Sequence, residues 1–429
     1  MSASVPGARR LPVVLRNPSF GAVWVGQLLT QAAVRMFQIG AVWWIVSSVG
    51  SDHRGLDAGL FLMVSTLPAV TLAPLVARII ARRAHRTVLA TAAGVAGALA
   101  AVTATWAYTQ TLPVAAAYVA GLALTTCQAV FDPCLTTSVP ELVEDADIEA
   151  ATGFELSTQS LAGLTGGLLG PLVVDAGGLA GVMAGCAGAY LLAAVLINSA
   201  RFPYATAPQK LTDESAPAPR TLRQVLAGLP FIRRILVCFA AANVFTTAVF
   251  VVMPLYTQGV LHSTGSTVAA LEGALGAGTL IGSFTGGCLP GRPITVGSAC
   301  LAVMAAALAL PGLLPGHAVA VGSLAVVGWS GGVIGVRFVS LFQRMVPPDD
   351  KPGFFAVMQA LLGAALPLSS LVFGALGDHL TARTLCLVQG IGLVPVTLAL
   401  WCLGIRADDT APVPSTALAH PGPPTGVAS

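Results

Sequence analysis

Long apolar runs, interrupted by short polar breaks, cover most of this 429-residue chain. Apolar and polar positions do not alternate along the runs, so they are typical of membrane helices and not of barrel strands. The breaks, the glycine and proline positions and the clusters of charge predict twelve spans near residues 20–47, 56–77, 87–107, 112–133, 155–174, 178–199, 235–259, 267–288, 294–312, 318–340, 354–377 and 384–404. The pattern therefore predicts an all-α, polytopic membrane protein.

The composition strengthens this prediction. Only 9% of the residues are charged and 55% are hydrophobic, and the mean hydropathy of +0.82 is far above that of a soluble chain of this length. Because lipid offers no partner to a free backbone N–H or C=O, each spanning segment must satisfy these groups within its own helix. The solvent of most of this chain is therefore lipid.

The basic residues orient the predicted helices. Lys and Arg gather in the cytoplasmic loops of membrane proteins, and with the N-terminus inside, seventeen of the 21 fall in inner loops. Arg54 and Arg383 fall in outer loops, whereas Arg35 and Arg337 lie within spans. This distribution predicts a multi-pass protein with both termini in the cytoplasm. It also accounts for the net charge of +3, so no nucleic-acid partner is expected.

The usage of basic residues points to a bacterial source. Lys210 and Lys351 are the only lysines, while alanine and glycine are abundant, which is typical of GC-rich bacterial genomes. We therefore expect the protein in the bacterial plasma (inner) membrane.

A proline-rich polar stretch divides the chain into two parts of similar length. We predict a cytoplasmic N-terminus, a six-helix bundle, a linker that ends in a short amphipathic helix near residues 222–235, a second six-helix bundle and a disordered cytoplasmic tail, at residues 1–19, 20–199, 200–234, 235–404 and 405–429. Two local matches relate the halves: residues 17–20 resemble 229–231, and residues 139–141 resemble 346–348. Internal repeats of this kind are common in secondary transporters.

Several motifs carry a family resemblance: Asn17-Pro18-Ser19-Phe20, Gly26-Gln27-Leu28, Phe131-Asp132-Pro133, Val139-Pro140-Glu141-Leu142-Val143 and Val346-Pro347. With them the chain resembles the major facilitator superfamily, in its drug-exporter branch with macrolide efflux and enterobactin exporter proteins. The likeness runs roughly from residue 15 to 405. It implies twelve helices in two pseudo-symmetric six-helix bundles that transport by alternating access. We expect a monomer without a cofactor.

The loop between the second and third spans departs from the family pattern. The resemblance places an aspartate of the gating loop at Ala81, where it is missing, and leaves Arg82, Arg83 and Arg86. These arginines either pair with a helix C-terminus or a carboxylate, or serve only as topology anchors. The chain therefore lacks the carboxylate that the resemblance assigns to the cytoplasmic latch.

The fifth span contains part of a motif that the resemblance associates with exporters. Gly166, Gly170 and Pro171 match it, whereas Val174 and Asp175 stand where small residues would continue it. Small residues allow close helix contact, and proline interrupts the helical hydrogen bonds. Two explanations fit these residues equally: close helix packing alone, or a role in setting the direction of transport.

Charged residues at membrane depth are costly, so each is a functional candidate. Arg35 is the strongest, because it lies near the middle of the first span, and the resemblance makes that helix line the central cavity. Its carboxylate candidates in the same half are Asp132 and Glu155. Protonation of either acid would weaken its contact with the arginine, which would couple a proton to a conformational change. Asp132 is alternatively a helix-end residue before Pro133.

The second half holds two more intramembrane charges. Glu272 lies in the eighth span and Arg337 toward the inner end of the tenth. By the repeat, Asp132 corresponds to position 339, so Asp132 and Arg337 are candidates for an inner gate; Arg337 alternatively snorkels inward. The spans also hold amides and aromatic side chains, which either line a mixed pocket or serve in helix packing and at the interface: Gln31, Gln38, Gln128, Asn243, Gln359, Trp24, Trp43 and Trp44.

The residue pattern favours a carrier over other classes. The six histidines fall in loops, span ends or the tail, the eight cysteines lack metal-ligand spacing, and no Walker sequence is present. We therefore expect no enzyme activity and no metal site. The best hypothesis is proton-linked export of a small amphipathic drug or secondary metabolite through the membrane. The alternatives are a lipid or lysolipid flippase of the same fold and a non-transporting membrane sensor.

Overall fold

A computed structural model describes residues 13–49, 52–144, 147–203, 230–346 and 351–409, and all regular structure in these ranges is helical. The first group of helices is α1 (Val13–Arg16), α2 (Pro18–Ser48), α3 (Arg54–Thr71), α4 (Ala73–Arg82), α5 (His85–Thr109), α6 (Val114–Leu142) and α7 (Ile148–Ser199). The second is α9 (Pro230–Thr246), α10 (Val249–Gly259), α11 (Gly265–Thr285), α12 (Pro293–Leu313), α13 (His317–Met345), α14 (Lys351–Gly363), α15 (Ala365–Gly377) and α16 (Ala382–Asp409). We call them the N-terminal set and the C-terminal set.

The prediction of an all-α membrane protein is confirmed. By length and hydropathy, eight helices of the described chain qualify as membrane spans, or nine when the bent pair α3 and α4 counts as one. α7 consists of two helical segments that cover two predicted spans, and they meet at Gly178, where the backbone leaves helical geometry with φ 62° and ψ −165°. Each of the twelve predicted ranges is helical over most of its length.

The ends of several helices differ from the predicted boundaries. α9 begins at Pro230, so the last residues of the predicted linker belong to a span rather than to a separate surface helix, and α16 continues to Asp409, beyond residue 404. Hydropathy marks only the apolar part of a helix, and its polar turns extend past the hydrocarbon. Residues 222–229 and the tail from 410 onward lie outside the described residues. The domain boundaries themselves stay predictions.

The start of the first span shows how local sequence sets a helix end. The side chain of Asn17 accepts a hydrogen bond of 3.1 Å from the backbone N–H of Phe20, and Pro18 occupies the first helical position. Both features are favoured at helix N-termini. Asn17 also donates from Nδ2 to the carbonyl of Leu142 at 2.7 Å, which ties α2 to the end of α6.

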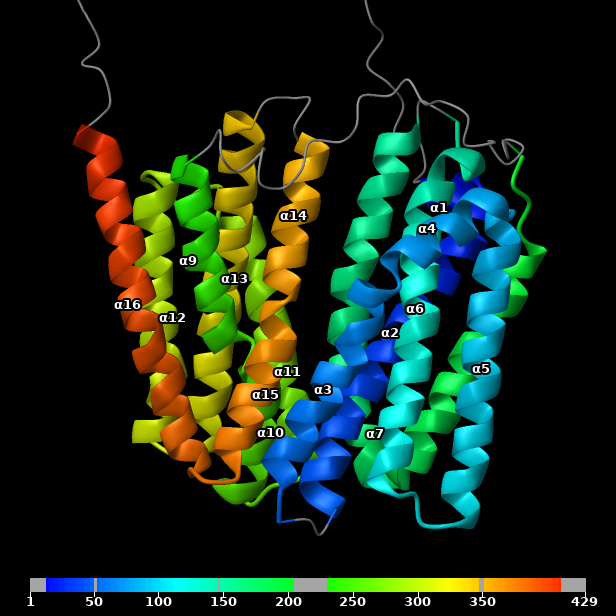
Figure 1. Cartoon of the computed structure of the whole chain (residues 1–429), viewed down its shortest axis with the longest axis horizontal. Helices are drawn as coiled ribbons and strands as arrows, with labels where there is room; N and C mark the ends of the chain where they lie inside the picture. Colours follow the sequence, from blue (N-terminus) through cyan, green and yellow to red (C-terminus); the bar gives the residue numbers. More distant parts are fainter. Residues whose placement is uncertain (1–12, 50–51, 145–146, 204–229, 347–350, 410–429) are drawn as a thin grey trace, which may run out of the picture.

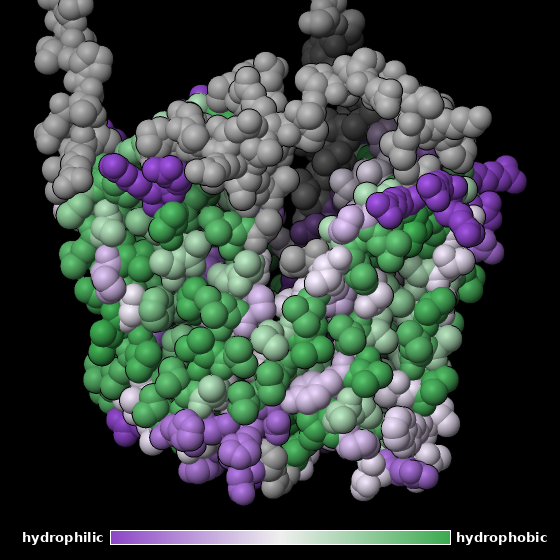
Figure 2. Space-filling view, viewed as in Figure 1, coloured by the Kyte–Doolittle hydropathy of each residue, from purple (hydrophilic) through white to green (hydrophobic). Residues whose placement is uncertain are grey.

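The two sets stand side by side (Figure 1), and the outer side of the molecule is largely hydrophobic between two hydrophilic ends (Figure 2). Among the exposed apolar side chains of the molecule are those of Phe284 and Val102. A soluble protein rarely exposes so many, so this belt is the surface that faces lipid.

The two sets touch at one end of the molecule and separate toward the other. The ends of α1 and α16 lie at what we call the α1 end, where Figure 1 shows the helices of the two sets diverging and Figure 2 shows a hollow between the sets. At the opposite end α3 packs against α15, and α7 against α11. One core cluster there joins Phe37 and Trp43 of α2 to Val251 and Val268 of the C-terminal set. The opposite end is therefore closed by apolar packing.

Candidate functional site

A buried polar cluster lies within the N-terminal set, where α2 meets α6. Asp132 Oδ1 accepts hydrogen bonds from Gln31 Nε2 at 3.1 Å and from Gln128 Nε2 at 2.6 Å. Gln128 and Asp132 lie one turn apart on α6 and thus share a face. The Oε1 atoms of both glutamines are buried without a hydrogen-bond partner among the described residues. The cluster therefore keeps acceptors available beside the carboxylate.

Glu155 forms a second contact between α6 and α7. Its side chain is 6% exposed, and Oε1 accepts a hydrogen bond from Thr136 at 2.5 Å. Its backbone carbonyl accepts from Gln27 Nε2 at 3.2 Å. Asp132 and Thr136 are one turn apart on α6, and Asp132 and Glu155 interact electrostatically. The two carboxyl groups therefore belong to one connected site.

Arg35 stands between these carboxyl groups and the C-terminal set. Its guanidinium donates from Nη1 to Gln38 Oε1 at 3.5 Å, and it interacts electrostatically with both Asp132 and Glu272. No carboxylate of the described residues lies within ion-pair distance of it, so the structure does not pair Arg35 tightly with Asp132 or Glu155. Arg35 is exposed and remains open to another partner.

Glycines of α7 bring Arg35 and Glu272 to the same level. A Cβ atom on Gly166 would lie 2.6 Å from Cβ of Arg35, and one on the next residue, Gly167, would lie 3.3 Å from Cβ of Glu272. α7 therefore contacts α2 and, on an adjacent face, α11 of the other set. The sequence had placed Glu272 in the second half without a partner, and the tertiary structure brings it within electrostatic range of Arg35.

The exporter-type residues of α7 serve close packing. A Cβ atom on Gly170 would lie 2.6 Å from the carbonyl oxygen of Met36 and 2.9 Å from the backbone nitrogen of Gly40. Pro171 follows within the helix and is buried. Only glycine permits this approach of α2 and α7, which holds the helix that carries Arg35 against the helix that reaches the other set.

A carboxylate of the C-terminal set caps a helix of the N-terminal set at the closed end. Asp378 Oδ1 accepts from the backbone N–H of Gly55 at 2.8 Å, and Oδ2 accepts from that of Leu56 at 3.3 Å. The side chain of Asp378 is 6% exposed, and His53 Nδ1 lies 3.5 Å from Oδ2. The N-cap residue His53 gives α3 no side-chain cap. Asp378 supplies that cap from the other set.

A second contact of this kind involves α7 and α11. Here the carboxylate belongs to the N-terminal set, and the helix start belongs to the C-terminal set. Asp175 Oδ1 accepts a hydrogen bond of 2.8 Å from Trp43 Nε1. A Cβ atom on Gly265, the first residue of α11, would lie 2.8 Å from each of these two atoms. Each set thus places a carboxylate at the start of a helix of the other set. Sequence reasoning missed both contacts, although Asp175 already stood out as a departure from the exporter motif.

The C-terminal set contains an apolar cavity of about 320 Å³. It is lined by α9, α12, α13 and α14, with the rings of Phe239, Phe338 and Phe342 and two amide side chains, Asn243 and Gln359. The Phe239 and Phe338 rings meet edge to face with centroids 4.4 Å apart. A largely apolar wall with few polar groups is typical of sites for organic ligands.

Arg337 lies beside this cavity on α13 but is not among its lining residues. Its Nε and Nη2 atoms are buried without a hydrogen-bond partner among the described residues, and it interacts electrostatically with Cys300 of α12. Asp132 has its partners in α2 and α6. The structure therefore does not bring Asp132 and Arg337 together as a gate.

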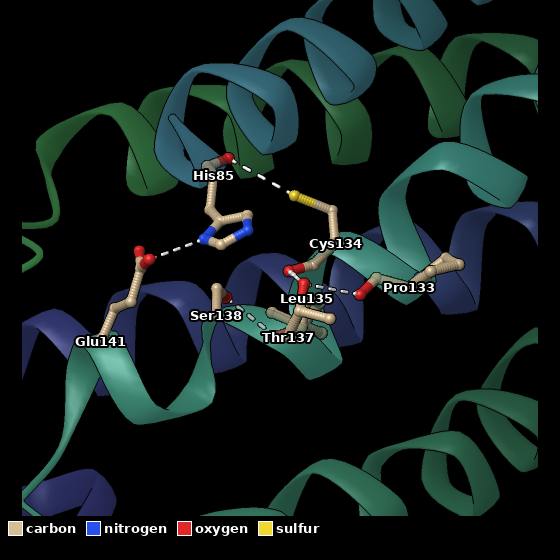
Figure 3. A network of polar contacts seen from close by, with 7 residues as sticks. All are labelled: His85, Pro133, Cys134, Leu135, Thr137, Ser138 and Glu141. Carbon is tan, nitrogen blue, oxygen red and sulfur yellow. Dashed lines mark hydrogen bonds and ion pairs between the residues drawn. The ribbon is translucent and has the colours of Figure 1, made fainter. Parts of the chain in front are cut away.

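The loop arginines lie at the α1 end. Arg82 and Arg83 are exposed at the end of α4, and Arg86 donates from Nη2 to the backbone carbonyl of Asn198 in the last turn of α7. Next to Arg86, the His85 ring and Glu141 Oε1 are 2.8 Å apart, and Cys134 Sγ donates to the carbonyl of His85 at 3.7 Å (Figure 3). These contacts fasten α5 to α6 and α7, near the position where the family aspartate is missing.

Comparisons with known proteins agree with this architecture. The family model described as Major Facilitator Superfamily matches residues 23–360. The chain belongs to this superfamily. Its members are transporters, so the protein is a membrane transporter and not an enzyme. Among the described residues, no group of three or more His, Cys, Asp or Glu side chains gathers as a metal site would require.

The individual similarities are distant. Macrolide efflux protein A of Streptococcus pyogenes is 20% identical over 390 residues, which cover 88% of this chain and 94% of that protein. The crystal structure of the POT family transporter PepTSo has a TM-score of 0.70 at 9% identity and covers 94% of this chain and 99% of its own. A bacterial homologue of the iron transporter ferroportin, in an inward-facing state, has a TM-score of 0.70 at 12% identity, with 91% and 98% covered. The structural similarities establish the fold.

Proposed function

We infer that this transporter exports a small amphipathic organic solute from a bacterial cell by antiport with protons. The observation that carries the proposal is that the two sets contain different kinds of site. The N-terminal set holds the titratable cluster around Asp132, and the C-terminal set holds the apolar cavity beside Phe338. Arg35 connects the two, because it interacts with Asp132 in its own set and with Glu272 in the other.

The charge arrangement supports coupling to protons. An ionised Asp132 attracts Arg35 into the N-terminal set, whereas a protonated Asp132 leaves Glu272 as the stronger attraction. Proton binding would then strengthen an electrostatic contact between the sets, and proton release would weaken it. A ligand changes a conformational equilibrium only through such a difference between states. The amides of Gln31 and Gln128 can bind both ionised and protonated Asp132, because each amide group can donate and accept hydrogen bonds.

The shape of the molecule and its charge distribution support a state that is open to the cytoplasm. The excess of arginines at the α1 end favours a cytoplasmic location for that end, so the hollow there faces the cytoplasm. The ferroportin homologue and a bacterial homologue of the lysosomal transporter Spinster, which has a TM-score of 0.63, were both solved inward-facing. The likeness to macrolide efflux protein A supports a macrolide as the first solute to test.

Transport in proteoliposomes tests this function directly. With an imposed pH gradient, the purified protein is expected to move a radiolabelled macrolide, and a protonophore is expected to remove the effect of the gradient. Asp132→Asn mimics the protonated acid, so it is expected to keep exchange of the solute and lose its dependence on the gradient. Movement of a fluorescent lysolipid without any macrolide transport would support a flippase and contradict the proposal.

The cavity of the C-terminal set gives a second test. Gly335 lines the cavity, and a Cβ atom on it meets no heavy atom within 4 Å, so Gly335→Phe is expected to fill the cavity while the fold is kept. We expect macrolide affinity to fall by about tenfold or more, the effect of losing roughly 1.4 kcal/mol of apolar contact. Equilibrium binding to the purified protein measures this. Gly188→Phe, at an exposed glycine with equally free surroundings, is the control and is expected to bind normally.

A further inference from the structure

We propose that the groove between α9 and α16 at the α1 end binds an anionic phospholipid. The groove has a volume of about 400 Å³, and its lining includes Arg233, Arg234, Val237, Ala399 and Cys402. It lies on the first and last helices of the C-terminal set, which contact each other. This site is separate from the cavity and the polar cluster described above, and it does not depend on the transported solute.

The two arginines supply the recognition of negative charge. Arg233 and Arg234 are both exposed, and neither forms a hydrogen bond or ion pair with a described residue. They lie at the beginning of α9, whose first turn contains no acidic residue. Cations at a helix N-terminus oppose the helix dipole. An anion bound there is attracted by both guanidinium groups, and it offsets their unfavourable interaction with the dipole of α9.

The remaining wall of the groove fits an acyl chain. Val237 is 60% exposed and lies one turn below Arg233, toward the middle of the membrane. Across the groove α16 presents Ala399 and Cys402. Both helices qualify as parts of membrane spans, so this wall faces hydrocarbon. Charge at the membrane surface and an apolar channel directly below it match the phosphate and the tail of one phospholipid.

A soluble anion would use only half of the site. A free phosphate would contact the guanidinium groups but leave the apolar wall empty, and a neutral phospholipid would lack the net charge that the arginines attract. Basic residues near a membrane surface favour anionic lipids by an amount that, for two arginines, corresponds to roughly 30-fold in affinity. The preference for an anionic over a zwitterionic headgroup is the property that the experiment must detect.

Two cysteines of the chain allow this test without added probes. Cys402 lines the groove, whereas Cys288 is also exposed but follows the end of α11, away from the groove. The full chain is placed in nanodiscs of phosphatidylcholine alone or with phosphatidylglycerol, and alkylation of each cysteine is followed by peptide mass spectrometry. Phosphatidylglycerol is expected to slow alkylation of Cys402 by about tenfold and to leave Cys288 unchanged.

Arg233→Gln/Arg234→Gln is expected to abolish the protection of Cys402. The matched control, Arg82→Gln/Arg83→Gln, removes the same charge from another exposed arginine pair at the same end and is expected to retain it. In the unmodified protein, high salt should also remove the protection of Cys402. This test uses no variant, so a folding defect cannot affect it. Equal protection by phosphatidylcholine, equal protection by inorganic phosphate in the absence of phosphatidylglycerol, or protection that survives the double substitution would each overturn the proposal.

Discussion

Replacing Gly59 with leucine is expected to hold the end opposite α1 open and to reduce transport on the order of 100-fold. A Cβ atom on Gly59 would lie 2.1 Å from the backbone carbonyl oxygen of Ser370, and one on Gly55 would lie 2.5 Å from that of Gly374. These are backbone atoms of α15, so no side-chain rotation relieves the overlap. An overpacking cost of about 3 kcal/mol in the closed state corresponds to the predicted loss.

The initial rate of macrolide export measures the functional effect, and a distance measurement tests its cause. Spin labels at the exposed positions Asp52 and His379, which flank α3 and α15, are expected to move apart in Gly59→Leu. Gly188→Leu, where a Cβ atom meets nothing within 4 Å, should leave both rate and distance unchanged. A Gly59→Leu protein with the distance of the unmodified protein would show that this contact does not control closure.

A milder variant separates the cap from the steric contact. Asp378→Ala removes the side chain that accepts from Gly55 and Leu56 but adds no atoms. Loss of a helix cap costs about 1 kcal/mol, so the same labels should report a partial shift toward the open state. If Gly59→Leu fails to fold, this variant still tests whether the closed end is held by contacts between the two sets.

The substitution with the second-largest expected effect is Arg35→Gln. It removes a side chain that interacts electrostatically with a carboxylate of each set, Asp132 and Glu272. Without it, protonation of Asp132 no longer changes the attraction between the sets. We expect gradient-driven macrolide transport to fall by about 30-fold, because two exposed charge contacts of about 1 kcal/mol each are lost.

The controls for Arg35 distinguish coupling from stability. Arg35→Lys keeps the charge and is expected to retain part of the activity, whereas Arg344→Gln removes an exposed arginine from the last turn of α13 and should be neutral. Amounts of folded protein in the membrane must match in all variants. Gradient-driven transport by Arg35→Gln at the rate of the unmodified protein would exclude Arg35 from the coupling mechanism.

Local sequence carried most of the information on the helices. Apolar runs must form helices in lipid whatever their neighbours are, so the predicted spans coincide with the observed helices, from 87–107 within α5 to 294–312 within α12. The errors lie at polar helix ends such as Pro230 and Asp409, where hydropathy gives no signal. The cost of charge at membrane depth likewise singled out Arg35 before any contact was known.

The partners of these residues followed from the packing of the two sets and not from any local pattern. Arg35 comes within electrostatic range of Glu272 because Gly166 and Gly167 let α2 and α11 approach adjacent faces of α7. Asp378 lies 323 residues from the Gly55 that it caps. The sequence by itself determined which segments enter the membrane, because solvation of the backbone is a local requirement. Only the tertiary structure decided which charges meet, because that depends on how closely whole helices pack.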